Sequence, residues 1–223
     1  LEAPEAWGIA AGDLATSGRR MTDGPATGTS RRTLSMEPEA RDTSWGPLSG
    51  LPGNPLMWVL IASELVVFGA ALIGYAGARA TDPVGFAAAQ GELDRLAGTI
   101  NTTVLITSGL FAALAVAAAR TGETRLCRGF LALAAALGGV FLYVKGLEYA
   151  AEIAAGRSLE TPGFFMIYFL ITGFHALHVV AGIVILAIVT VWPSVENVET
   201  GAAFWHMVDL VWVIVFPCLY LLR

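Results

Sequence analysis

Long apolar stretches separated by short polar segments dominate the chain from residue 50 onward. Each stretch has about 20 residues or more, enough to cross the hydrocarbon core of a bilayer at a rise of 1.5 Å per residue. We therefore predict an all-α membrane protein in which residues 50–223 form a bundle of five transmembrane helices. The predicted spans cover approximately residues 56–79, 99–119, 126–154, 164–190 and 201–222.

The segments between these stretches contain residues that typically start or end helices. Pro55 suits the first turn of the first span, where its missing N–H costs nothing. Pro193 ends the fourth span, and we expect a polar loop over Ala80–Gly91. Pro217 removes one backbone hydrogen bond near the end of the last span and is expected to kink it.

Residues 1–49 differ from the rest of the chain because they lack apolar periodicity and are rich in Gly, Ala, Ser, Thr, Pro and Arg. Such a composition predicts a disordered or loosely attached N-terminal tail. The tail contains no apolar core of the length that secretory signal peptides require, so it is not interpreted as one.

Composition and charge support the membrane interpretation. The chain is 56% hydrophobic and only 14% charged, unlike an ordinary soluble domain. Lys145 is the only lysine, so no basic stripe indicates nucleic-acid binding. Cys127 and Cys218 have neither metal-site nor redox spacing. Arginines near the tail and between the second and third spans outnumber those on the opposite side, which favours a cytoplasmic N-terminus.

Five polar side chains stand out inside the predicted spans. A charge at such depth costs about 2.5–3.5 kcal/mol, so these side chains are expected to face protein and one another in an intramembrane polar seam. We expect Glu64 to hydrogen-bond a histidine of the fourth span, His178 being the better candidate. Hydrogen bonding between helices is the simpler role for the histidines; a di-histidine carboxylate metal site is the alternative. The seam comprises Glu64, His175, His178, His206 and Asp209.

Two further features lie toward the predicted ends of spans. Lys145 and Glu148, three residues apart, are interpreted as a local ion pair where the third span reaches the membrane interface. His206 is placed one turn inside the last span, at the interface, with Asp209 one turn deeper. Aromatic residues are expected mostly in interfacial belts or against lipid; they include Trp58, Trp192, Trp205, Trp212 and Tyr220.

Several catalytic patterns are missing from the sequence. Three histidines are too few for a haem-copper catalytic subunit, and no close cysteine pair suits a two-copper electron-entry site. No Gly-rich phosphate loop or zinc-site spacing is present. We therefore expect no catalytic residues, no bound metal and no chemistry of its own.

Four segments resemble subunit III of the haem-copper respiratory oxidases, in the same order. They are ASELVVFGA around Glu64, KGLEYAAEI around Glu148, FFMIYFLITGFHALHVVAGI around the histidine pair, and FWHMVDLVWVIVFPCLYL around His206 and Asp209. The chain resembles the short, five-helix bacterial form of this family. WHMVDLVW followed by FPCLYLL is also similar to the branch associated with nitric oxide reductase.

The resemblance implies a non-catalytic integral subunit of the bacterial cytoplasmic membrane that docks against catalytic subunit I. Such a subunit stabilises subunit I and supports proton uptake, while haem and copper belong to the partner; phospholipid is the ligand implied for the subunit itself. The family's intramembrane glutamate falls on Glu64. The alternatives are an accessory subunit of a nitric oxide reductase, a haem- or metal-binding membrane redox protein, and a small proton or solute transporter.

Overall fold

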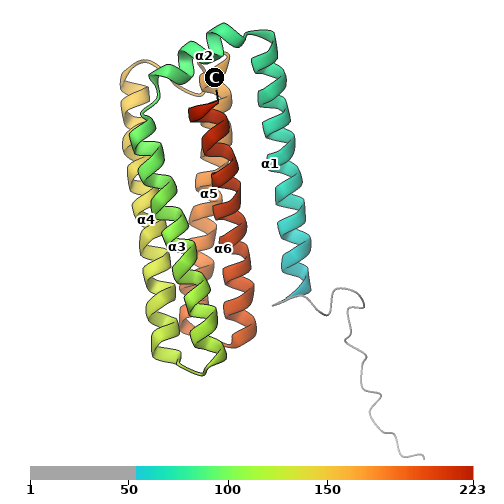
Figure 1. The fold of residues 1–223 in the computed structure, drawn as a ribbon, viewed down its shortest axis with the longest axis vertical. Helices are drawn as coiled ribbons and strands as arrows, with labels where there is room; N and C mark the ends of the chain where they lie inside the picture. Colours follow the sequence, from blue (N-terminus) through green and yellow to red (C-terminus); the bar gives the residue numbers. More distant parts are fainter. Residues whose placement is uncertain (1–53, 223) are drawn as a thin grey trace, which may run out of the picture. The chain divides into compact units, whose positions relative to one another are not determined.

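The computed structural model describes residues 54–222, and every regular element in this part of the chain is helical (Figure 1). The elements are α1 (Pro55–Thr81), α2 (Pro83–Glu92), α3 (Arg95–Arg120), α4 (Thr124–Ala154), α5 (Phe164–Val191), α6 (Val195–Phe216) and the π-helical segment η2 (Pro217–Leu221). Within the described residues, five helices are long and apolar enough to cross a membrane, which confirms the predicted fold class. The predicted tail, residues 1–49, lies outside the described residues.

Helix α2 occupies the segment that was expected to be a polar loop, Ala80–Gly91, so this expectation was wrong. The Asp82 side chain accepts a hydrogen bond of 2.9 Å from a backbone N–H of the first turn, and Pro83 follows at the first helical position. This pair is a strong helix-start signal. Phe86 and Gln90, four residues apart, are buried on one face, so tertiary packing also supports the helix.

Two spans begin earlier than the apolar pattern predicts, because their first turns are polar. Asp94 caps the start of α3 by accepting hydrogen bonds from two backbone N–H groups. The Ser194 side chain caps α6 by accepting one hydrogen bond, from the Asn197 backbone N–H, so α6 begins at Val195, six residues before the predicted start at Gly201. Residues in α6 therefore lie deeper in the bundle than the sequence indicates.

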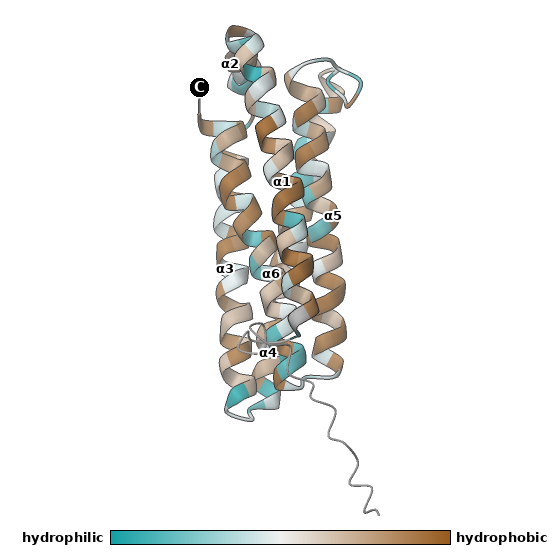
Figure 2. Ribbon diagram, turned by 90° about the vertical axis from the view of Figure 1, so that its right-hand side faces the viewer, coloured by the Kyte–Doolittle hydropathy of each residue, from teal (hydrophilic) through white to brown (hydrophobic). Residues whose placement is uncertain are grey.

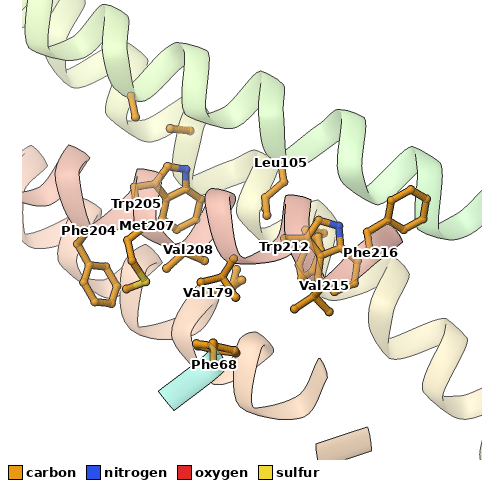
Figure 3. Packing of buried hydrophobic residues seen from close by; sticks show 14 of the residues in the cluster. Phe68, Leu105, Val179, Phe204, Trp205, Met207, Val208, Trp212, Val215 and Phe216 are labelled. Carbon is orange, nitrogen blue, oxygen red and sulfur yellow. The ribbon is translucent and has the colours of Figure 1, made fainter. Parts of the chain in front are cut away.

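Helix α6 is the central element and packs against α3, α5 and α1 (Figure 1). In the most hydrophobic 18-residue stretch of each span, 61% of the residues are buried in the span that contains α6, but only 11% in α1. Trp205 and Trp212 of α6 lie among the buried hydrophobic residues (Figure 3). Both bond to α3: Trp205 donates to the Ser108 hydroxyl at 2.9 Å, and Trp212 donates to the Thr102 hydroxyl at 3.0 Å. Hydrophilic residues gather mainly at the two ends of the helices (Figure 2).

Trp205 fits the bundle only because two neighbouring helices carry glycine beside its ring. A Cβ on Gly138 of α4 would lie 2.5 Å from the indole, and one on Gly182 of α5 would lie 2.6 Å from it. Neither distance leaves room for a side chain, so α4, α5 and α6 meet at close range around this ring.

At Pro217, where a kink was predicted, α6 is followed directly by the π-helical segment η2. Backbone carbonyls of this segment are bonded by side chains from two other helices. The Tyr75 hydroxyl of α1 donates to the Cys218 carbonyl at 3.0 Å, and the Gln90 amide of α2 donates to the carbonyls of Cys218 and Leu219 at 3.0 and 3.1 Å. These bonds fix η2 in place and orient the side chain of Tyr220 toward the bundle interior, where it is buried.

Candidate functional site

Glu64 of α1 and His178 of α5 form the pair that the sequence predicts, with 3.0 Å between Glu64 Oε2 and His178 Nε2. His178 Nδ1 lies 2.8 Å from the carbonyl oxygen of Phe174. A carbonyl oxygen can only accept, so Nδ1 carries a proton. The contact between Nε2 and the carboxyl then needs one more proton, held by either group. The pair is thus a proton-sharing contact between two membrane helices.

His175 does not join this pair, although it lies only one turn away on the same helix. Its ring stacks on Trp212, with centroids 5.0 Å apart, and meets the edge of Phe141 at 5.5 Å. The side chain is fully buried, and neither ring nitrogen has a hydrogen-bond partner among the described residues. A spacing of three residues turns a helical side chain by about 60° relative to the first, so His175 points into the bundle core and His178 toward α1.

His206 and Asp209 form a loose pair in the middle of α6, not at the interface. His206 Nδ1 lies 3.8 Å from Asp209 Oδ2, and 46% of the His206 side chain is exposed. His206 lies eleven positions after the first residue of α6, about 16 Å along the helix. Asp209 Oδ1 has no hydrogen-bond partner among the described residues. The interfacial placement was wrong because α6 begins at Val195.

The five residues of the predicted polar seam therefore do not meet in one place. Glu64 and His178 are together, His206 and Asp209 form a second site, and His175 stands alone among aromatic rings. In residues 54–222, no three His, Cys, Asp or Glu side chains are grouped closely enough to hold a metal ion. The geometry consequently gives no support to a di-histidine carboxylate metal site.

Lys145 and Glu148 of α4 form the predicted ion pair, with 3.2 Å between Lys145 Nζ and Glu148 Oε2. Lys145 is 2% exposed and lies inside the bundle. Lys145 also donates to the hydroxyls of Tyr168 and Tyr220 at 2.9 and 2.5 Å. Both hydroxyls in turn donate to Glu148 Oε1, at 2.6 and 2.5 Å. These four side chains, called here the lysine cluster, form a closed hydrogen-bonded ring.

The two tyrosines of the lysine cluster were not predicted from the sequence. Tyr220 was expected near lipid, as were Trp205 and Trp212, yet all three side chains are buried. Trp192 is 65% exposed, in keeping with the expectation for it. A single lysine within an apolar helix could have signalled the cluster, because a buried ammonium needs partners for all three of its N–H groups.

An apolar groove of about 470 Å³ runs between α1, α3 and α6. Trp58, Val116 and Met207 contribute to its walls, and His206 lines its middle. An ion pair stands at one end, where an Arg120 nitrogen lies 2.8 Å from a Glu199 carboxylate oxygen. The groove thus combines an apolar length with charged groups at one end, a shape suited to an amphipathic molecule.

Comparison with known proteins agrees with this architecture. The family model described as "Cytochrome c oxidase subunit III" matches residues 57–222. "Cytochrome c oxidase subunit 3" of Thermostichus vulcanus is 35% identical over 141 residues, which cover 59% of this chain and 68% of the relative. "Probable cytochrome c oxidase subunit 3" of Nocardia farcinica is 26% identical, covering 75% and 86% of the two chains.

A third relative is a larger protein. "Heme-copper oxidase subunit I+III" of Aeropyrum pernix is 30% identical over 180 residues, which cover 74% of this chain and 22% of the relative. The match to the family model includes nearly all of the five membrane helices and the three acid–base pairs within them. The chain therefore belongs to the cytochrome c oxidase subunit III family and is a multi-pass membrane protein.

Proposed function

We propose that this chain is the non-catalytic subunit III of a haem-copper respiratory oxidase in a bacterial cytoplasmic membrane, with its N-terminus on the cytoplasmic side. It docks against the catalytic subunit I, stabilises it and supports proton uptake. The observation that carries the proposal is the family match over residues 57–222. The relative from Aeropyrum pernix supports the partnership, since its name combines subunits I and III in one chain.

The positions of the three histidines support a subunit without its own redox centre. His178 is engaged with Glu64, His206 lies beside Asp209, and His175 is enclosed by aromatic rings. A haem or metal centre would need ligands converging on one cavity. Haem and copper are accordingly assigned to the partner subunit. The three relatives compared above carry oxidase names, which favours an oxidase over a nitric oxide reductase.

The Glu64–His178 pair supports a part in proton handling. Glu64 lies nine residues after the start of α1, about 14 Å into the helix. Ionisable groups at membrane depth commonly mark proton pathways. Because this pair holds one proton between two bases and lies partly open at the bundle surface, it can take up or release a proton without unfolding a helix.

The groove between α1, α3 and α6 supports phospholipid as a bound component. Its apolar walls suit an acyl chain, and Arg120 at its end is 60% exposed. A guanidinium has five N–H donors, so Arg120 can bind a phosphate while it keeps its bond to Glu199.

Purification of the tagged chain from native membranes tests the proposal. The expected result is co-purification with a large subunit that shows haem absorption, while the chain separated from it contains no stoichiometric haem or copper. In a strain lacking the chain, the oxidase should retain its haem spectrum but lose activity faster during turnover. Stoichiometric haem in the separated chain, or an unchanged turnover lifetime in its absence, would contradict the proposal.

A further inference from the structure

A cavity of about 410 Å³ opens at the α2 end of the bundle and leads toward the lysine cluster. Its outer wall carries Glu92, of which about half the side chain is exposed, together with Asp94. Its inner wall includes Glu148. A polar cavity of this size has room for several water molecules. It therefore offers an aqueous route from the membrane surface to a carboxylate that is otherwise buried.

Charged side chains hold the mouth of this cavity in shape. Arg157, in the loop after α4, donates to Glu152 of α4 at 2.5 Å and also pairs with Glu92 of α2. Its guanidinium packs over the ring of Phe165 at 5.0 Å. The mouth is thus lined by groups that already bond one another, so the opening is part of the folded structure.

Glu148 is the only member of the lysine cluster that lines the cavity among the described residues, and Lys145 lies behind it. All three N–H groups of Lys145 are used inside the cluster, on Glu148, Tyr168 and Tyr220. A proton that leaves Lys145 must therefore pass to one of these three side chains. A proton that passes through either tyrosine hydroxyl also reaches Glu148, because each hydroxyl donates to Glu148 Oε1.

The hydrogen bonds define a balanced proton transfer. The Lys145 ammonium passes a proton to a tyrosine hydroxyl as that hydroxyl passes its own proton to Glu148, or it passes the proton to Glu148 directly. The product is a neutral amine beside a neutral carboxylic acid. Glu148 then releases the proton to water in the cavity and returns to a carboxylate. Reversal of these steps reloads Lys145.

We propose that Lys145 and Glu148 form a proton-exchange site, in which Lys145 stores a proton and Glu148 passes it to and from the cavity. The site depends on no redox centre or partner, so it goes beyond the proposed function. With a cytoplasmic N-terminus, the cavity opens on the opposite face of the membrane, because α1 runs from the N-terminal end to the α2 end (Figure 1). The titratable and charged groups facing the pair are Glu92, Asp94, Tyr149, Glu152, Arg157, Tyr168, His175 and Tyr220.

The test exploits the fact that Lys145 is the only lysine of the chain. The full chain, labelled with ¹⁵N-lysine and reconstituted in lipid nanodiscs, gives one side-chain signal without further assignment. The exchange of its Nζ protons with water is then measured by NMR. Glu148→Gln should slow this exchange by about 100-fold, the low end of what a positioned acid–base group contributes.

A second variant keeps the cluster intact and blocks the cavity. Ala151→Phe fills a position on the cavity wall, whereas Ala154→Phe adds the same ring to an exposed position of α4 that does not line it. Ala151→Phe should slow the exchange at Lys145, and Ala154→Phe should leave it at the wild-type rate. Equal exchange rates in the wild type and Ala151→Phe would overturn the proposal, even if Glu148→Gln fails to fold.

Discussion

The lysine cluster and the Glu64–His178 pair each join an acid to a base inside the membrane spans, yet they differ in how completely their atoms are bonded. Lys145 and Glu148 are buried and fully partnered through side chains from α5 and η2. Glu64 and His178 have side chains 20% and 14% exposed, and one hydrogen bond joins the two side chains between α1 and α5. The Lys145–Glu148 pair thus stabilises the centre of the bundle, whereas the Glu64–His178 pair attaches the peripheral helix α1 to α5.

Glycine positions show the same contrast in packing. Cβ atoms on Gly138 and Gly182 would collide with Trp205 in the centre of the bundle. At Gly69, Gly74 and Gly77 of α1, no atom lies within 4 Å of the corresponding position. Close packing therefore stabilises the bundle around Trp205, whereas these three glycines of α1 have no close neighbour from another helix.

Loss of the lysine should have the largest effect on stability. Lys145→Met leaves the Glu148 carboxylate buried without its ammonium, and the free energy of unfolding should fall by about 3–5 kcal/mol. The double variant Lys145→Met, Glu148→Leu should recover part of this loss, because no charge is then left alone. Unfolding by SDS in mixed micelles measures both. A loss below about 1 kcal/mol in the single variant would remove the distinction between the two regions.

Adding one methyl group beside Trp205 should have an intermediate effect. Gly138→Ala places a Cβ against the indole ring and should lower the free energy of unfolding by about 1–3 kcal/mol. Gly139→Ala, the matched control, meets no atom within 4 Å and should raise the free energy of unfolding by up to about 0.5–1 kcal/mol. Equal effects of the two changes, measured by the same unfolding assay, would show that Trp205 can move aside.

Removal of the peripheral acid should have the smallest effect. Glu64→Leu deprives His178 Nε2 of its partner and should cost about 1–2 kcal/mol, while His178 Nδ1 keeps its bond to Phe174. Glu64→Gln should cost less, because its amide can still donate to Nε2. If Glu64→Leu destabilised the chain as much as Lys145→Met does, α1 would belong to the centre of the bundle after all.

The sequence sufficed for the five spans and for the Glu64–His178 contact, because both follow from the cost of polar groups in a bilayer. It did not suffice for the rotation of each helix about its axis, which decides whether His175 shares the face of His178. Nor did it place Tyr168 and Tyr220, which lie 23 and 75 residues from Lys145. Their convergence depends on tertiary packing and on the π turn at Pro217, neither of which has a local pattern.

Helix α1 is attached at three levels, and each attachment has a consequence for biosynthesis. The Asn54 backbone N–H donates to Thr200, Glu64 bonds His178, and Tyr75 and Arg79 donate to the carbonyls of Cys218 and Leu222. These partners lie 114 to 146 residues further along the chain. The first of the five spans to leave the ribosome therefore meets these partners only after α5, α6 and η2 have been synthesised.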